Sequence, residues 1–183
     1  PYPDEEDYKQ TVLHEYWHVF QNAQISDRRS DDSKVKKVRN EKLTGDVIKR
    51  PWLLEGSATF MALVLYSDEV GHDRELRRQM LRYSKRSLSN YLKSSMKLHE
   101  FTYEGEERRM AYDIGAWFTA YLVHNEGVEA LKDGFYGDLD SLGFTGSFEK
   151  NFGQSPADYV EEFNEFMRKN RRNIKALTGL FLE

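Results

Sequence analysis

Apolar residues recur at intervals of three and four along most of the chain, which is the spacing of helices with one buried face. Strictly alternating segments are scarce, and residues 98–103 are the best candidate for a short strand. The pattern predicts a mainly α-helical protein with few or no short strands. The expected helices cover residues 4–24, 51–66, 73–91, 108–124, 128–135 and 156–170.

The first of these helices carries an unusual amount of apolar surface. Tyr8, Val12 and Tyr16 follow helical spacing, and we expect them to form its buried stripe. Leu13 and Trp17 add apolar surface on a neighbouring face. An interior helix is predicted, and its polar members then require an explanation.

A polar stretch separates the first two apolar helices. Residues 26–50 are rich in Asp, Ser, Arg and Lys. We expect an exposed and mobile insertion with a short helix near residues 35–38. Pro51 suits the first turn of the helix that follows. Near the end of the chain, Ser155 and Pro156 have the order of an N-cap and a first helical residue.

Length and composition agree with one folded domain. The chain has 183 residues, of which 39% are hydrophobic and 14% aromatic, enough for a substantial core. We therefore expect a single helical domain over residues 1–183. The chain contains no cysteine, which excludes disulfides and thiol catalysis. No apolar run reaches the roughly 20 residues of a membrane span. It begins Pro-Tyr-Pro without Met, so we expect it to belong to a longer protein.

Basic residues gather in one segment although the net charge is only −4. Residues 74–97 hold eight Lys or Arg residues and one acid, a local charge of +7, which leaves −11 for the remainder. The ordinary interpretation is a solvated helix face balanced by acidic neighbours. The alternative is a surface that binds polyanions. No nucleic-acid-binding motif is present, and we expect no nucleic acid partner.

The strongest chemical signal is the sequence His14-Glu15-Tyr16-Trp17-His18 inside the first expected helix. Positions four apart lie one turn apart on one helix face, so both imidazoles can reach a single ion. Glu15 adjoins the first histidine and is placed to act as a general base on water. This pattern arises by chance in roughly one chain per hundred of this composition. The alternative interpretation is a pair of hydrogen-bonded core histidines.

A catalytic zinc site has three protein ligands and one open position, so a third ligand is needed. Glu55 qualifies, because it is a lone carboxylate between Leu54 and Ala58 on a strongly apolar helix. Such a group is costly to bury unless it is paired or bound to a metal. Gly56 is expected to give space where this helix approaches the first one.

The combination of motifs resembles the gluzincin metallopeptidases, which include thermolysin and the aminopeptidase N group. The similarity lies in the His-Glu-x-x-His sequence, in Trp-Leu-x-Glu-Gly-x-Ala around Glu55, and in Tyr-x-x-Gly at Tyr112. Residues 148–155 and the helix after them are similar to the helical tail of many gluzincin domains. The implied fold is a helical zincin subdomain. The implied site is Zn²⁺ held by His14, His18 and Glu55, with Glu15 as base and Tyr112 as oxyanion donor.

Two departures from the family pattern limit this resemblance. Residues 19–54 separate His18 from Glu55, a longer gap than in thermolysin, and the polar insertion at residues 26–50 accounts for the excess. We expect that insertion to cover or border the cleft. Only thirteen residues of this sequence precede His14, too few to contain the substrate-aligning sheet of relatives. An aminopeptidase assignment is therefore not supported, and an upstream domain of the same protein is expected.

The leading hypothesis is a zinc peptidase acting on a peptide or protein substrate, and the second is a related module that binds peptide, glycan or protein without cleavage. The resemblance slightly favours a secreted or cell-envelope protein of a bacterium. Thr59 is either a hydrogen-bond partner of a ligand histidine or a plain helix-face residue. We expect no catalytic role for the four other candidates, which are His72, His99, Asp113 and His124.

Overall fold

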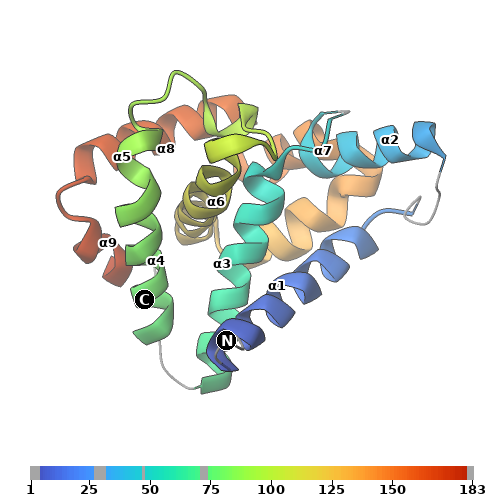
Figure 1. Cartoon of the computed structure of the whole chain (residues 1–183). Coiled ribbons are helices and arrows are strands. Elements are labelled where there is room, and N and C mark those ends of the chain that lie inside the picture. The colour runs from blue at the N-terminus through green and yellow to red at the C-terminus, as the bar shows by residue number, and fades with distance from the viewer. Residues whose placement is uncertain (1–4, 27–31, 47, 71–73, 181–183) are drawn as a thin grey trace.

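The computed structural model describes residues 5–26, 32–46, 48–70 and 74–180. The protein is mainly helical, as predicted, and the described ranges contain no strand (Figure 1). The α-helices are α1 (Glu5–Ala23), α2 (Ser33–Thr44), α3 (Pro51–Val70), α4 (Arg74–Tyr83), α5 (Ser89–Tyr91), α6 (Gly105–Glu126), α7 (Tyr136–Phe152), α8 (Pro156–Asn170) and α9 (Ile174–Leu180).

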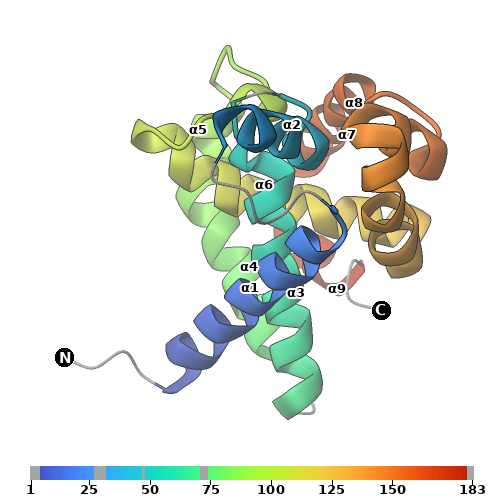
Figure 2. The ribbon, with the colours of Figure 1, turned by 90° about the vertical axis from the view of Figure 1, so that its right-hand side faces the viewer.

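Helices α3 and α6 pack against each other at the centre, and α1 lies across α3 (Figures 1 and 2). Helices α4 and α9 flank one side of this pair, while α2 packs on α7 at the other. None of the helices within the described ranges combines the length and apolarity that a membrane span requires. The centre of the core is aromatic and fully buried, with Trp52, Trp117, Phe118, Phe148 and Phe163 among its members.

Two glycines allow α3 and α6 to approach closely. A Cβ atom added at Gly56 would lie 2.4 Å from the backbone of Gly115, and one added at Gly115 would lie 2.3 Å from the Trp52 carbonyl oxygen. The space at Gly56 therefore serves the contact with α6, not the expected contact with α1. This crossing fixes Glu55 and Tyr112 relative to each other, because each precedes one of the two glycines on its helix.

Replacing Gly56 with alanine is expected to destabilise the fold by about 1–3 kcal/mol or more, because the added methyl group meets backbone that cannot move aside. The matched control is Gly137→Ala on α7, where an added Cβ meets no atom within 4 Å. That change is expected to be neutral or stabilising by up to about 1 kcal/mol, since alanine favours helix. Urea unfolding measures both. Equal stability of the two variants would contradict the close crossing.

The prediction that the apolar stripe of α1 is buried is wrong. Tyr8, Val12, Tyr16 and Val19 are exposed by 62%, 48%, 64% and 65%. The face turned toward α3 instead carries both motif histidines, Trp17 and Gln21. Helical spacing identifies a face but not its direction. Here the contacts between the histidines and Glu55 orient the helix, which answers why polar residues occupy its inner side.

The polar insertion is more ordered than expected where the structure describes it. Helix α2 spans twelve residues, its first turn is capped by the Asp32 side chain, and Gly45 ends it in the left-handed conformation with φ of 78°. Buried Leu43 and an ion pair of 2.6 Å between Lys42 and Asp140 hold α2 on α7. The insertion lies at α7, and residues 27–31 and 47 are outside the described ranges.

Of the other local predictions, the helix N-cap at Ser155 is confirmed and the strand at residues 98–103 is wrong. The N-cap at Ser155 is confirmed, because its side chain accepts a hydrogen bond from the Asp158 backbone N–H. The strand expected at residues 98–103 is wrong: Leu98–Glu100 forms a 3₁₀ turn whose Leu98 packs into the core. The predicted helix over residues 73–91 begins at Arg74 in the described chain and passes through a π-helical turn at Ser84–Leu88. A second π-helical segment, Ala130–Phe135, leads into α7.

Candidate metal centre

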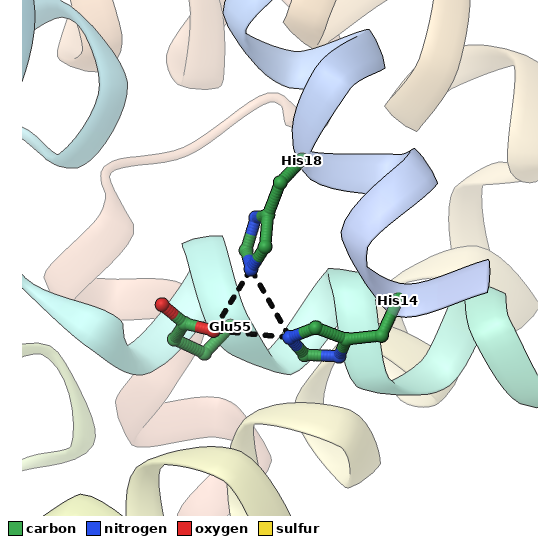
Figure 3. Close-up of side chains that lie close together, drawn as sticks. All are labelled: His14, His18 and Glu55. Carbon is green, nitrogen blue, oxygen red and sulfur yellow. Dashed lines mark hydrogen bonds and ion pairs between the residues drawn. The ribbon is translucent and has the colours of Figure 1, made fainter. Parts of the chain in front are cut away.

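Three ligand atoms from two helices meet at one point, as Figure 3 shows. His14 and His18 project from α1, and Glu55 projects toward them from α3. His14 Nε2 lies 3.2 Å and His18 Nε2 lies 3.0 Å from Glu55 Oε2, and the two nitrogens are 3.1 Å apart. The structure thus brings together the three residues predicted as ligands, and this group could hold a metal ion.

The spacing of these atoms fits a tetrahedral ion. Ligands at about 2.0–2.1 Å from zinc in tetrahedral geometry are separated from one another by about 3.3 Å. The three observed separations of 3.0, 3.1 and 3.2 Å are close to this value. Hydrogen bonds alone explain this arrangement poorly. Two N–H groups that both donate to Glu55 Oε2 bring their positively charged hydrogen atoms close together, and these repel each other. A cation at the centre of the three atoms would accept a lone pair from each of them.

Gln21 fixes the orientation and tautomer of His18. Its amide nitrogen donates to the Leu54 carbonyl oxygen at 2.9 Å, so its oxygen faces the imidazole. His18 Nδ1–H donates to that oxygen at 2.6 Å. In the neutral ring, Nε2 therefore presents a lone pair to the centre. Partners of this kind orient ligand histidines and raise their basicity.

Gln21 is itself held in a fully buried network. It is 0% exposed, and its amide nitrogen also contacts Ser57 Oγ at 2.9 Å and the Tyr136 hydroxyl at 2.8 Å. Ser57 Oγ and the Tyr136 hydroxyl lie 2.7 Å apart. The network connects α1, α3 and α7. The position of His18 is therefore set by three helices at once.

Tyr103 holds the other oxygen of Glu55. Its hydroxyl donates to Glu55 Oε1 at 2.6 Å, which leaves Oε2 directed at the imidazoles. The carboxylate is only 4% exposed. Tyr103 follows the 3₁₀ turn and reaches across 48 sequence positions. One carboxylate oxygen therefore faces the two imidazoles, and the other is held by a supporting hydrogen bond.

The surroundings of the centre favour the ionised form of Glu55 and the protonated form of His18. Burial by itself raises the pKa of Glu55, but hydrogen bonds from His14, His18 and Tyr103 outweigh it and hold that pKa well below its usual range. Burial likewise lowers the pKa of His18, yet Glu55 reverses this and the pKa is raised overall. Burial and the bond to Glu55 raise the pKa of Tyr103. The site therefore attracts positive charge to this point.

An open pocket of about 560 Å³ borders the centre. Both residues with predicted catalytic roles, Glu15 and Tyr112, line it together with His14. The Tyr112 ring stacks on the His14 imidazole with centroids 6.0 Å apart and planes inclined by 9°. Burial, and then the charge of Glu55, raise the pKa of Tyr112 to about 12. Its hydroxyl keeps its proton near neutral pH and interacts with the side chains of Glu55 and Arg108.

The other residues that the sequence analysis considered lie outside the ligand group. The structure describes four of these five residues. Buried Asp113 forms an ion pair with Arg86 and accepts a hydrogen bond from Ser87. The Thr59 hydroxyl has no hydrogen-bond partner and the residue lines the pocket, so of its two interpretations the structure favours the plain helix-face residue. His99 packs against Trp52, and His124 is exposed near the end of α6. His72 lies outside the described ranges.

The described residues of the insertion, 26, 32–46 and 48–50, do not line this pocket, contrary to expectation. All residues that line it come from α1, α3, α4, α6 and the π-helical turn. The reason is the ion pair and apolar contact that hold α2 on α7. Residues 27–31 and 47 of the insertion lie outside the described ranges.

Tyr103→Phe is expected to weaken zinc binding about 10–100-fold, because the change frees Glu55 Oε1 while the aromatic ring stays. Tyr8→Phe is the matched control, since Tyr8 lies on α1 and is 62% exposed. Competition with a zinc-binding dye measures both affinities. An affinity unchanged in Tyr103→Phe would show that the hydroxyl does not position the carboxylate.

We compared the chain with protein-family models, with curated proteins and with solved structures, and none of the three comparisons found a match. The structure places His14, His18 and Glu55 as one group that could hold a metal ion.

Proposed function

We propose that this protein is a zinc-dependent peptidase whose metal ligands are His14, His18 and Glu55. Two imidazole nitrogens and one carboxylate oxygen form a ligand set that suits zinc. The observation that carries the proposal is the position of this set beside an open pocket that Glu15 and Tyr112 also line. Structural zinc sites are closed by a fourth protein ligand, whereas catalytic sites keep one position open.

The proposed chemistry needs a base next to the ligands. Bound zinc supplies Lewis acidity, which polarises a carbonyl group and makes water a stronger acid. Glu15 is exposed in the pocket and adjoins His14 on α1. Its carboxylate accepts the proton of the attacking water and then delivers it to the leaving amine. Because Glu15 lines the pocket and is not a member of the ligand group, it stays available for this transfer.

Tyr112 supplies the complementary hydrogen bond. Negative charge develops on the carbonyl oxygen of the peptide as water adds to it, and a fixed donor stabilises that charge. The Tyr112 hydroxyl is protonated near neutral pH, as any tyrosine is, and burial together with Glu55 raises its pKa further, to about 12. Tyr112 lies one helical turn before Gly115, and the close contact between Gly115 and Gly56 therefore fixes its position. A donor of this type contributes about 10²–10³ in rate.

The test is hydrolysis of a mixed peptide library by the full chain, followed by mass spectrometry. We expect cleavage that stops when a chelator removes the metal and returns when zinc is added. The control is the same library with chelator and zinc but without protein. Full zinc occupancy with no cleavage would contradict the peptidase proposal and favour the second hypothesis, a module that binds without cleaving.

A further inference from the structure

Two neighbouring hollows lie along α4 and the π-helical turn that follows it. The first, of about 770 Å³, and the second, of about 540 Å³, share Leu81 and Lys85. We call the two hollows together the basic groove. The cations of the first are Arg74, Arg77, Arg78, Arg82, Lys85 and Arg86. The second adds Lys93, Arg171, Arg172 and Lys175.

The fold brings together two basic segments that are distant in sequence. Helix α9 and the residues before it pack beside α4 (Figure 1), so Arg171, Arg172 and Lys175 face the same hollow as Lys85 and Lys93. No acidic residue of the described chain lines either hollow. The expected balance by acidic neighbours is therefore present at Arg78 and Arg86, which pair with Glu75 and Asp113, but no acid lines the hollows themselves.

The positive charge of the groove is largely unpaired. Arg78 pairs with Glu75, and Arg86 pairs with Asp113. Within the ranges that the structure describes, seven other cations of the groove form no ion pair, namely Arg74, Arg82, Lys85, Lys93, Arg171, Arg172 and Lys175. Gathered like charges raise the local potential and attract anions from solution.

The floor of the groove is apolar. Leu81, Leu88, Leu92 and Ile174 line the second hollow together with its cations and with Ser84 and Ser89. A small inorganic anion contacts only the cationic rim and leaves this floor uncovered. The lining residues include no aromatic ring on which a base of single-stranded nucleic acid could stack. The floor and rim together match a ligand that carries both carboxylates and aliphatic side chains.

We propose that the basic groove binds an acidic polypeptide segment, with its carboxylates at the cationic rim and its aliphatic side chains on the Leu81, Leu88, Leu92 and Ile174 floor. Arg86 lines both this groove and the pocket beside the metal centre. A polypeptide in the groove can therefore extend toward that pocket. Binding at the groove goes beyond the proposed peptidase function and does not depend on it.

Fluorescence anisotropy of a labelled peptide rich in Glu and Leu tests the proposal on the full chain with and without zinc. The groove variant is Lys85→Glu combined with Arg172→Glu. The control variant is Lys34→Glu combined with Lys37→Glu on α2, which produces the same change in net charge away from the groove. We expect the groove variant to bind at least about tenfold more weakly, and the control variant to bind as the unmodified protein does.

Two further probes separate the contributions of rim and floor. A peptide with Ser in place of Leu is expected to bind about tenfold more weakly, because it leaves the floor uncovered. Equal binding by the groove and control variants would overturn the proposal. Tighter binding of a single-stranded oligonucleotide or of phosphatidylserine vesicles than of the Glu–Leu peptide would overturn it as well. Circular dichroism confirms that each variant is folded.

Discussion

His14→Ala is expected to reduce bound zinc from about one ion per chain to almost none. The change removes one of three ligand atoms that converge within hydrogen-bonding distance, and two ligands hold zinc weakly. The expected loss of affinity exceeds about 100-fold, because loss of a mere supporting partner already costs 10–100-fold. His14 is half-buried at the pocket edge, so its truncation leaves the core intact. Elemental analysis after gel filtration measures the bound metal.

His124→Ala is the matched control for this change. It removes an exposed histidine from α6, which is outside the ligand group, and is expected to keep full zinc content. Circular dichroism and thermal unfolding show whether each variant is folded. Full zinc content in folded His14→Ala would rule out the proposed ligand set.

Glu15→Gln is expected to lower peptide hydrolysis by about 10²–10⁴ while zinc content stays unchanged. The amide has the shape of the carboxylate but cannot accept the proton of water. Glu15 is exposed and does not belong to the ligand group, so the substitution disturbs neither fold nor metal. Initial rates on a cleaved library peptide, measured at equal zinc occupancy, give the effect.

Glu149→Gln controls for the loss of one negative charge, because Glu149 is exposed on α7. Its rate is expected to equal that of the unmodified protein. Near-normal hydrolysis in zinc-loaded Glu15→Gln would exclude Glu15 as the base. Parallel loss of rate and zinc would instead assign it a role in holding the metal.

The ligand group could be predicted from sequence because each member carries a local signal. The two histidines show helical spacing within five residues, and Glu55 is a lone acid in an apolar segment. The same periodicity misled at α1, where Tyr8, Val12 and Tyr16 are exposed. Apolar spacing marks a face without showing which neighbour covers it. At α1 the polar contacts to Glu55 determine the inner face.

The supporting residues were missed for different reasons. Gln21 lies three residues after His18 on the same face of α1, so helical spacing offered a signal that was not used. Tyr103 offered none, because its contact with Glu55 depends on how the chain after the 3₁₀ turn returns to α3. Contacts between residues far apart in sequence follow from packing and not from local pattern.

Helix α7 is not among the helices that the sequence pattern predicts, and its glycines explain why. Gly137, Gly143 and Gly146 weaken its helical propensity, and Gly143 adopts φ of 67° at a kink. Burial of Phe144, Phe148 and other aromatic residues overrides this weakness. Tertiary packing, which a single sequence does not display, decides such segments.

Anomalous diffraction at the zinc absorption edge, from crystals of the zinc-loaded protein, tests the central claim most directly. We predict one strong peak at about 2.0–2.2 Å from His14 Nε2, His18 Nε2 and a Glu55 carboxylate oxygen together. A peak at other residues, or a Glu55 carboxyl group turned away from both imidazoles, would contradict it.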